Sequence, residues 1–355
     1  SYSTMSHPLV TVLIDTYNHE QFIEHAIVSV LEQDLENKDW EILVIDDGST
    51  DRTPDIIRKF SSQVRYIRKQ NGGQASAFNL GIPEAKGEII AFLDGDDWWR
   101  QDKLRRVLKV LETSPEVGAV GHGIIEAYDS GTKRQVAISS PLQLYIQDID
   151  SALTFQRVRS QLGTSRFTAC KSLLEEILPV PDDLVVEADE FMFTLAAATV
   201  PTIFLSECLT YYRLHGNNLY QFSHYDEAKL RRKNQVHQSL LRNLPPKMTA
   251  LGLSAEAIQE TLKLTWIDAE RGRLALEGGA SWETWRVEQV ADQRKLATSS
   301  WEKHFFGYAV LALALLLPPQ IIYRLRRSYS EQSLFNLRRT QPSPELPLPE
   351  VDLLK

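Results

Sequence analysis

Three short apolar runs in the first hundred residues each end in acidic side chains. They are Val10–Ile14, before Asp15; Ile42–Ile45, before Asp46 and Asp47; and Ile89–Leu93, before Asp94. Runs of this length suit buried strands and are too short for ordinary helices. Segments with helical spacing separate them, Gln21–Leu31 and Thr53–Phe60, the second with Thr as N-cap and Pro at the first helical position. Apolar strands that alternate with helices predict an α/β fold with a parallel sheet covered on both faces.

The rest of the chain divides by pattern. Weaker strands are predicted at Val64–Ile67, Val117–Val120 and Ile203–Leu205, and short helices at Lys103–Leu111 and Glu190–Ala198. We expect an α/β domain over 1–225, a helical extension over 226–300, and an apolar and basic segment over 301–327. Residues 328–355 are polar, and Pro342–Pro349 holds four prolines, so we expect a disordered tail.

Composition narrows the class of protein. Apolar residues make up 43% and charged residues 24%, which is ordinary for a globular chain. Lys plus Arg number 39 against 47 Asp plus Glu, a net charge of −8, which argues against a nucleic-acid partner. The two cysteines, Cys170 and Cys208, form no disulfide framework and suit a reducing compartment. Ser1–Pro8 shows no secretory leader, so we expect a cytoplasmic catalytic domain.

Carboxylates gather where the predicted strands end. Ligands of doubly wound sheets bind beyond the carboxyl ends of the strands, and many carboxylates at one edge are costly without a cation. Hard oxygen ligands suit Mg²⁺ or Mn²⁺. Asp94 and Asp96 alternate, so their side chains point the same way if the strand continues. The pattern therefore predicts a metal-bound phosphoryl ligand.

Taken alone, each of these motifs has a simpler interpretation. Asp46–Ser49 is more often a turn than a site, and an Asp-x-Asp pair is common in loops. A dinucleotide-binding site is not indicated, because no Gly-x-Gly-x-x-Gly follows the first strand. It is the complete set, in order and at strand ends, that favours a functional site.

Several motifs together resemble family 2 glycosyltransferases with the GT-A fold, the nucleotide-diphospho-sugar transferase superfamily. Those with the closest likeness are Pro8–Asn18, Ile45–Asp51, Asn71–Gly81 and Gly87–Trp98, which bears the Asp-x-Asp. Val186–Phe193 and Tyr211–Asn217 are similar to the late acidic motif and the C-terminal His motif of that family. The helical region after 226 is outside the resemblance.

The resemblance implies roles for individual residues. Asp15, Thr16 and Tyr17 would line the pocket for the nucleotide base, and Asp47 would hydrogen-bond the base. Asp94 would hold the ribose or diphosphate side, Asp96 would ligate Mn²⁺ or Mg²⁺, and His215 would be a further ligand beside Asp94. Gly95 belongs to the same motif, and Gln74 and Asn79 would orient the donor or its loop. The chain departs from the family at Phe78, where Arg is common.

The resemblance also implies a catalytic base after Val186. Transfer with inversion needs one carboxylate to accept the proton of the acceptor hydroxyl. The Glu-Asp pair of the family is not intact here, and Asp189 is the first choice, Glu190 the second and Glu187 the third. Acidic residues at a helix N-terminus are also favoured by its dipole alone.

The leading hypothesis is a metal-dependent, inverting glycosyltransferase that uses a nucleoside-diphosphate sugar, UDP-sugars being favoured. A role in cell-surface polysaccharide or glycolipid assembly follows, with a glycan, glycolipid or lipid-linked sugar as acceptor. The alternatives are a catalytically silent nucleotide-sugar-binding scaffold and a sugar nucleotidyltransferase. Sugar nucleotidyltransferases typically have a Gly-rich loop with basic residues just after the first strand. This chain has Tyr17–Glu20 there instead, which argues against that class.

The segment 304–327 predicts attachment to the inner face of the membrane. Phe305–Leu317 carries no charge, but as a helix it spans about 20 Å, short of the roughly 30 Å hydrocarbon core. Pro318 and Pro319 follow, and then Arg324, Arg326 and Arg327. Such a segment suits a short helix or hairpin in one leaflet, with the arginines at anionic headgroups. The alternative is a buried helix that covers the catalytic domain.

Overall fold

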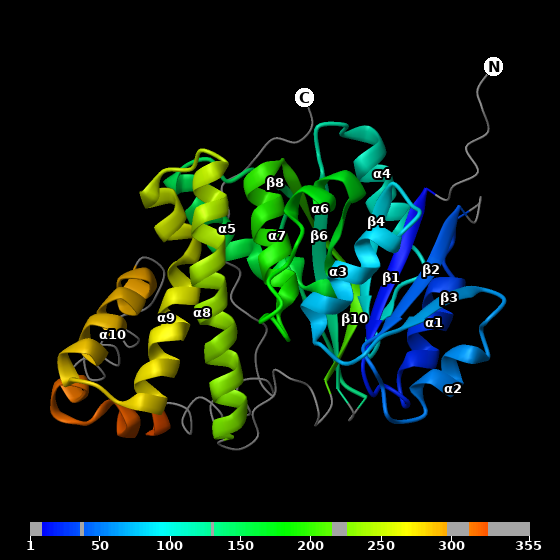
Figure 1. Cartoon of the computed structure of the whole chain (residues 1–355). Coiled ribbons are helices and arrows are strands. Elements are labelled where there is room, and N and C mark those ends of the chain that lie inside the picture. The colour runs from blue at the N-terminus through cyan, green and yellow to red at the C-terminus, as the bar shows by residue number, and fades with distance from the viewer. Residues whose placement is uncertain (1–8, 36–38, 129–130, 215–225, 297–311, 326–355) are drawn as a thin grey trace. The chain divides into compact units, whose positions relative to one another are not determined.

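A computed structural model describes residues 9–35, 39–128, 131–214, 226–296 and 312–325 of the chain (Figure 1). The described residues divide into two compact units. The first holds the chain up to residue 214 together with 244–258, and the second holds 226–243 and the described residues after 258. We describe each unit by itself.

The first unit is built on a ten-stranded sheet with the order β3-β2-β1-β4-β9-β6-β10-β5, and β7 and β8 pair with β6 and β10. The strands are β1 (Val10–Thr16), β2 (Trp40–Asp46), β3 (Val64–Arg68), β4 (Ile89–Asp94), β5 (Trp98–Trp99), β6 (Ala119–Tyr128), β7 (Lys133–Val136), β8 (Leu142–Leu144), β9 (Thr168–Cys170) and β10 (Thr202–Leu214). β1, β2, β3 and β4 are mutually parallel neighbours, and β6 and β10 are also parallel. The predicted α/β fold is confirmed, with the three apolar runs side by side at its centre.

Helices cover both faces of this sheet (Figure 1). Alternate residues of β1 face opposite ways, as the period of a strand requires. Val12 and Ile14 belong to a core with Ile27 of α1 (Ile23–Leu31). On the other face α3 (Gln74–Glu84) packs so closely that a Cβ at Gly81 would lie 2.7 Å from Leu13 Cδ1. Burial on both faces explains why these strands are apolar throughout rather than alternating.

The short strands β5, β7, β8 and β9 pair antiparallel, which the sequence did not indicate. β9 is inserted between β4 and β6 and is only three residues long. β10 is much longer than the predicted Ile203–Leu205, and its second half reaches β5. The sheet therefore continues beyond β4 through β9, β6, β10 and β5.

The remaining helices of the first unit connect the strands. They are α2 (Thr53–Arg58), α4 (Lys103–Thr113), α5 (Ile149–Val158), α6 (Lys171–Ile177) and α7 (Ala188–Thr199). α7 begins two residues before the helix predicted at Glu190–Ala198, so Asp189 and Glu190 lie inside its first turn.

Three long helices follow: α8 (Glu227–Ala250), α9 (Ala255–Glu277) and α10 (Ser281–Leu296). In the second unit Leu274 of α9 packs with Val287 of α10 and with Tyr323. Arg271 also bonds the buried Glu288 at 2.8 Å through two nitrogens, which fixes α9 against α10. No helix among the described residues is both long and apolar enough to cross a bilayer.

Candidate active site

Two aspartates meet at the carboxyl ends of the central strands. Asp15 of β1 and Asp94 of β4 are paired in the parallel register, on the face that carries α3. Gln74, the first residue of α3, donates from Nε2 to Asp15 Oδ2 at 3.3 Å and to Thr164 Oγ1 at 3.3 Å. Its Oε1 accepts from the backbone N–H of Ala188 at 3.0 Å. Gln74 therefore ties β1 to the starts of α3 and α7.

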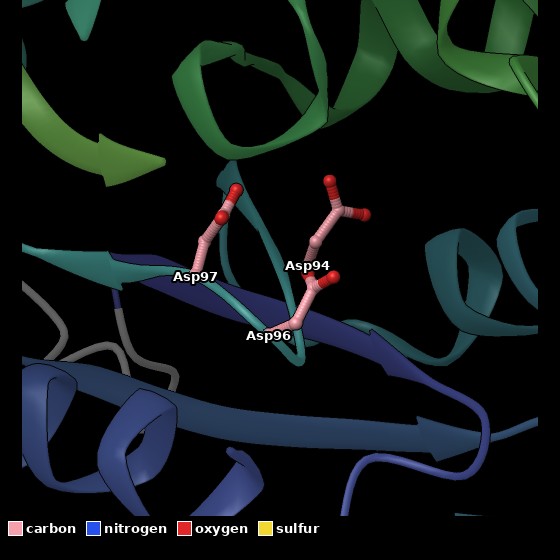
Figure 2. A group of neighbouring side chains, drawn as sticks. All are labelled: Asp94, Asp96 and Asp97. Atoms are coloured by element: carbon pink, nitrogen blue, oxygen red, sulfur yellow. The ribbon is translucent and has the colours of Figure 1, made fainter. Parts of the chain in front are cut away.

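The turn after β4 adds two more carboxylates. Asp94, Asp96 and Asp97 offer oxygens that all lie within 4.8 Å of one another, and Figure 2 shows the three side chains on the same side of the turn. Ser165 Oγ donates to Asp97 Oδ2 at 2.6 Å and accepts from the Asp94 backbone N–H at 3.0 Å. Three carboxylates this close match the oxygen-rich donor set that Mg²⁺ or Mn²⁺ takes.

Burial perturbs these carboxyls strongly. Loss of solvent raises the pKa of Asp15 to about 7 and the pKa of Asp97 to about 8. The pKa of Asp94 is raised well above its usual range, first by burial and then by Asp15, Asp96 and Asp97. Like charges that share a desolvated site oppose one another's ionisation, and a bound cation would relieve this.

Two of the predicted base-pocket residues, Asp15 and Thr16, contact this turn at Gly95. Thr16 is buried, and its Oγ1 lies 3.1 Å from Nδ1 of His19, whereas Tyr17 is 44% exposed. Gly95 donates its N–H to the Asp15 carbonyl at 2.9 Å, and a Cβ there would lie 2.6 Å from Thr16 Oγ1. Glycine lets the acidic turn pack directly against the end of β1.

Asp47 organises the glycine segment before α3. Its carboxylate accepts from Lys69 Nζ at 2.7 Å, from the Gly72 N–H at 2.9 Å and from the Gly73 N–H at 2.7 Å. Three of its roughly four lone-pair positions are thus used within the protein. A hydrogen bond from a nucleotide base to Asp47, as predicted, would therefore have to use the one lone-pair position that is left.

Gly73 offers a test of how tightly this segment is built. Its φ is +86° and its ψ 175°, and a Cβ there would lie 2.5 Å from Val185 Cα. Gly73→Ala should therefore destabilise the protein by about 2–5 kcal/mol, from backbone strain and overpacking together. Gly252 has a φ of +88° with no atom within 4 Å of a Cβ, so Gly252→Ala should cost only about 1–2 kcal/mol. Urea or thermal unfolding measures both, and equal losses would contradict the packing argument.

Asp189 lies at the start of α7 and is held by a distant loop. Its Oδ2 accepts from the Thr164 N–H at 2.8 Å and from Thr164 Oγ1 at 3.0 Å, and its Oδ1 accepts from the Glu190 N–H at 2.9 Å. Burial raises its pKa, while the bonds from Thr164 lower it. Glu190 is instead ion-paired with Arg159, and Glu187 precedes α7 with a φ of +56°.

Two positions of the glycine motif serve the packing of α3. Asn79 donates from Nδ2 to the Val180 carbonyl and accepts from the Val180 N–H, each at 2.8 Å, so it holds the loop before α7. Phe78 is fully buried and meets Phe92 edge to face, with ring centroids 5.4 Å apart. An apolar side chain is suited to this position of the core.

Hydrogen bonds at Ser165 and Arg213 hold the acidic turn in place. The Ser165 carbonyl accepts from Thr210 Oγ1 at 2.7 Å, from Trp99 Nε1 at 3.1 Å and from the buried Lys103 Nζ at 3.3 Å. Arg213 donates its backbone N–H to Asp97 Oδ1 and its Nε–H to the Asp96 carbonyl, both at 3.0 Å. The acidic turn is therefore fixed from β10 and from the loop before β9.

Sequence reasoning found the carboxylates and missed the groups that hold them. Thr164 and Ser165 lie in Gly163–Phe167, where no pattern marks a function, and Lys69 carries no signal of its own. Arg213 lies within Tyr211–Asn217, the segment similar to the C-terminal His motif, but no role was expected for it. His215, the expected further metal ligand, lies outside the described residues. The structure brings together Asp15, Gln74, Asp94, Gly95, Asp96, Asp97 and Asp189.

The chain is similar in sequence to known glycosyltransferases. The family described as "Glycosyl transferase family 2" matches residues 11–174. An uncharacterised glycosyltransferase of Nostoc sp. is 34% identical over 219 residues, which cover 59% of this chain and 66% of the relative. A Bacillus subtilis protein named as a teichuronic acid biosynthesis glycosyltransferase, TuaG, is 30% identical over 60% of this chain and 81% of its own length.

Solved structures share the fold at low sequence identity. TarS 1–349 of S. aureus in complex with UDP-GlcNAc has a TM-score of 0.54 and 18% identity, covering 91% of this chain and 92% of TarS 1–349. The mannosyltransferase PcManGT of Pyrobaculum calidifontis, in complex with GDP-Man and Mn²⁺, has a TM-score of 0.52 and 21% identity. That match covers 95% of this chain and 89% of the other.

Proposed function

The chain belongs to glycosyl transferase family 2 and is a glycosyltransferase, and we propose that it moves a sugar from a nucleoside-diphosphate sugar to an acceptor hydroxyl with a divalent metal ion and with inversion. The observation that carries the proposal is the group of Asp94, Asp96 and Asp97, whose oxygens lie within 4.8 Å of one another beside the end of β1. The family relationship supports transfer in general, and the site supports the metal and the donor.

Asp94 and Asp96 would hold Mn²⁺ or Mg²⁺, as would His215. Asp97 is the buried member of the three, and its hydrogen bonds from Ser165 Oγ and from the Arg213 N–H hold the acidic turn in place, so we assign Asp97 chiefly to support. When bound, the cation supplies Lewis-acid stabilisation of the leaving diphosphate. Complexes of related folds with UDP-GlcNAc and with GDP-Man and Mn²⁺ support a nucleotide-sugar donor.

Asp189 is the proposed general base. In the transfer the acceptor oxygen attacks the anomeric carbon, the bond from that carbon to the diphosphate oxygen breaks, and the hydroxyl proton passes to Asp189. Thr164 fixes the carboxylate through two hydrogen bonds to one oxygen. Glu190 is less suited, because the ion pair with Arg159 occupies it.

Donor turnover tests the proposed function. The intact protein with Mn²⁺ is offered UDP-, GDP- and dTDP-sugars, and nucleoside diphosphate release and thermal shift are recorded. We expect one donor class to give a shift and slow release, and Asp96→Ala to weaken nucleotide binding. A protein that releases no diphosphate from any donor, and whose nucleotide binding is unaffected by Asp96→Ala, would instead be a silent scaffold.

We also propose that the segment 304–327 attaches the protein to a membrane surface, which would place the acceptor there. Of this segment, 312–316 and 319–325 are described as helical. Some of its described apolar side chains are exposed, with Leu313 at 48%, Leu315 at 54%, Leu316 at 78% and Leu325 at 58%, whereas Ala314, Ile322 and Tyr323 are buried. An exposed apolar patch next to Arg324 suits insertion among anionic headgroups.

Vesicle binding tests this attachment. Leu315→Glu with Leu316→Glu in the full chain should lower partition to vesicles containing phosphatidylglycerol by at least about tenfold, because two leucines lose their burial in lipid. Leu153→Glu with Leu251→Glu places the same charge at exposed leucines outside the segment, and should change partition little. Equal binding by both double variants, or no binding by the unaltered chain, would contradict the proposal.

A further inference from the structure

The ring of His19 lies against the acidic turn. Its Nε2 is 3.9 Å from Asp96 Oδ2, and its Nδ1 is 3.1 Å from Thr16 Oγ1. A Cβ at Gly95 would lie only 2.7 Å from that Nδ1, so the turn fits against the ring because residue 95 is glycine. His19 therefore connects the end of β1 to the carboxylate of Asp96, one of the proposed metal ligands.

Three hydrogen bonds fix the main chain of His19. Its N–H donates to Thr53 Oγ1 at 2.9 Å, and its carbonyl accepts from the N–H groups of Phe22 and Ile23, each at 2.9 Å. Thr53 begins α2, and Ile23 begins α1. The His19 side chain is only 22% exposed. The position of the ring is thus set by contacts with β1, α1 and α2 rather than by solvent.

The neighbours of the ring indicate which of its nitrogens carries hydrogen. An ionised carboxylate only accepts hydrogen bonds, so a favourable contact with Asp96 requires a hydrogen on Nε2. In the neutral ring Nδ1 is then an acceptor, and the Thr16 hydroxyl beside it is able to donate. The ring therefore presents an N–H to Asp96 Oδ2. The separation of 3.9 Å is longer than a hydrogen bond, and such contacts in active sites often tighten when the ligand binds.

Asp96 is held differently from the other two carboxylates of the turn. Asp97 accepts from Ser165 Oγ at 2.6 Å, and the Asp94 N–H donates to the same oxygen at 3.0 Å. Asp96 instead lies beside His19. A carboxylate that binds a metal is usually hydrogen-bonded by a second residue, and loss of that residue typically costs about 10–100-fold in metal affinity. His19 is placed to be that second residue for Asp96.

We propose that His19 is a positioning residue for the metal site, an assignment that rests on the proposed function. Its Nε2–H holds one carboxylate oxygen of Asp96 and leaves the other for the cation, while the Thr16 hydroxyl holds the ring through Nδ1. His19 contacts neither the donor nor the acceptor in this role. It fixes the direction in which Asp96 presents its lone pairs, so its loss weakens metal binding.

Mn²⁺ binding tests the assignment. The full-length protein is titrated with Mn²⁺ in the presence of UDP or GDP, and the EPR signal of the free ion is recorded. A titration without protein corrects for Mn²⁺ held by the nucleotide alone. His19→Ala should weaken Mn²⁺ binding about 10–100-fold. His19→Gln should recover part of the loss, because its amide N–H can donate to Asp96 in place of Nε2–H.

Gln21→Ala is the matched control. It removes an exposed polar side chain two positions further along the same segment. It should bind Mn²⁺ as the unaltered chain does, because substitutions at exposed positions usually change little.

Thr16→Val tests the connection from Thr16 through the ring to Asp96. The variant keeps the shape of residue 16 and removes its hydroxyl, so Mn²⁺ binding should weaken about 2–10-fold, the net worth of one neutral hydrogen bond. Added to His19→Ala, the same substitution should cost nothing further, because the ring that it orients is already gone. An equal loss in both backgrounds would show that the two residues act separately and would overturn the connection.

Two outcomes would overturn the assignment while the proposed function stands. The first is Mn²⁺ binding by His19→Ala that equals that of Gln21→Ala. The second is an equal loss of Mn²⁺ binding by His19→Ala and His19→Gln with equally lowered unfolding temperatures, because the ring would then serve the fold alone. An unaltered chain that binds no Mn²⁺ with either nucleotide would instead refute the proposed metal dependence, and this assignment with it.

Discussion

Asp189→Asn should lower turnover by about 10²–10⁴-fold while donor binding is retained, because the variant keeps the shape of the side chain and removes its basicity. Asparagine keeps one acceptor oxygen, so it preserves either the two bonds from Thr164 or the bond from the Glu190 N–H. Transfer rate, donor affinity and unfolding temperature should be measured together, so that a loss of base is distinguished from a loss of structure.

Glu190→Gln is the matched control for this result. It lies one residue away and also changes a carboxylate to an amide, but it removes only the ion pair with Arg159. We expect a much smaller fall in turnover. If Glu190→Gln is inactive and Asp189→Asn is active, the assignment of the base is wrong by one residue.

The pH profile gives an independent reading of the same group. Burial raises the pKa of Asp189, and Glu190 also raises it, whereas Thr164 and Arg166 lower it. Asp189 must be ionised to accept a proton, so kcat/KM should fall as the pH falls through this raised pKa. The acid limb should lie above the ordinary range of an aspartate, and Asp189→Asn should remove it.

Removal of the metal should abolish transfer. Excess EDTA should stop turnover, and Mn²⁺ or Mg²⁺ added beyond the chelator should restore it, because Asp94 and Asp96 leave a cation to complete its ligands with the diphosphate. Asp96→Asn should lower activity by at least about 10–100-fold. Loss of a residue that only hydrogen-bonds a metal ligand already costs that much, and Asp96 is a proposed ligand itself. Its Mn²⁺ affinity in the presence of nucleotide should fall in parallel.

The control for this prediction is Asp150→Asn, which removes one negative charge from an exposed position of α5. It should leave Mn²⁺ affinity and turnover unchanged. Full activity in excess EDTA, or an Asp96→Asn variant as active as Asp150→Asn, would refute metal dependence.

The parallel centre of the fold was predictable because its signal is local. Each of Val10–Ile14, Ile42–Ile45 and Ile89–Leu93 is buried on both faces, so hydrophobicity alone marks it. β9 gave no such signal, since Thr168–Cys170 is three residues long and is a strand only because β4 and β6 lie on either side of it. The start of α7 was predicted two residues late. Glu187, the residue before the helix, has a left-handed backbone conformation, and no sequence pattern marks this.

The carboxylates of the site were predictable because they follow the strands directly. Asp15 and Asp94 had to meet once β1 and β4 were parallel neighbours, since parallel strands bring their carboxyl ends to one edge. The residue types then indicated a cation and a phosphoryl ligand. These inferences need only the order of elements and the chemistry of the side chains.

What each carboxylate does was decided by tertiary contacts between segments far apart in the chain. Ser165 binds Asp97 across 68 positions, Thr164 binds Asp189 across 25, and Gln74 reaches Ala188 across 114. Such bonds depend on the path of loops that have no periodicity, so neither composition nor spacing encodes them visibly. The sequence by itself determined the parallel centre of the sheet and its acidic edge, and it predicted a cation and a phosphoryl ligand there. Only the folded structure separated the aspartate held for support, Asp97, from the one held beside Thr164, Asp189, because desolvation and hydrogen bonding arise from what surrounds a group in space.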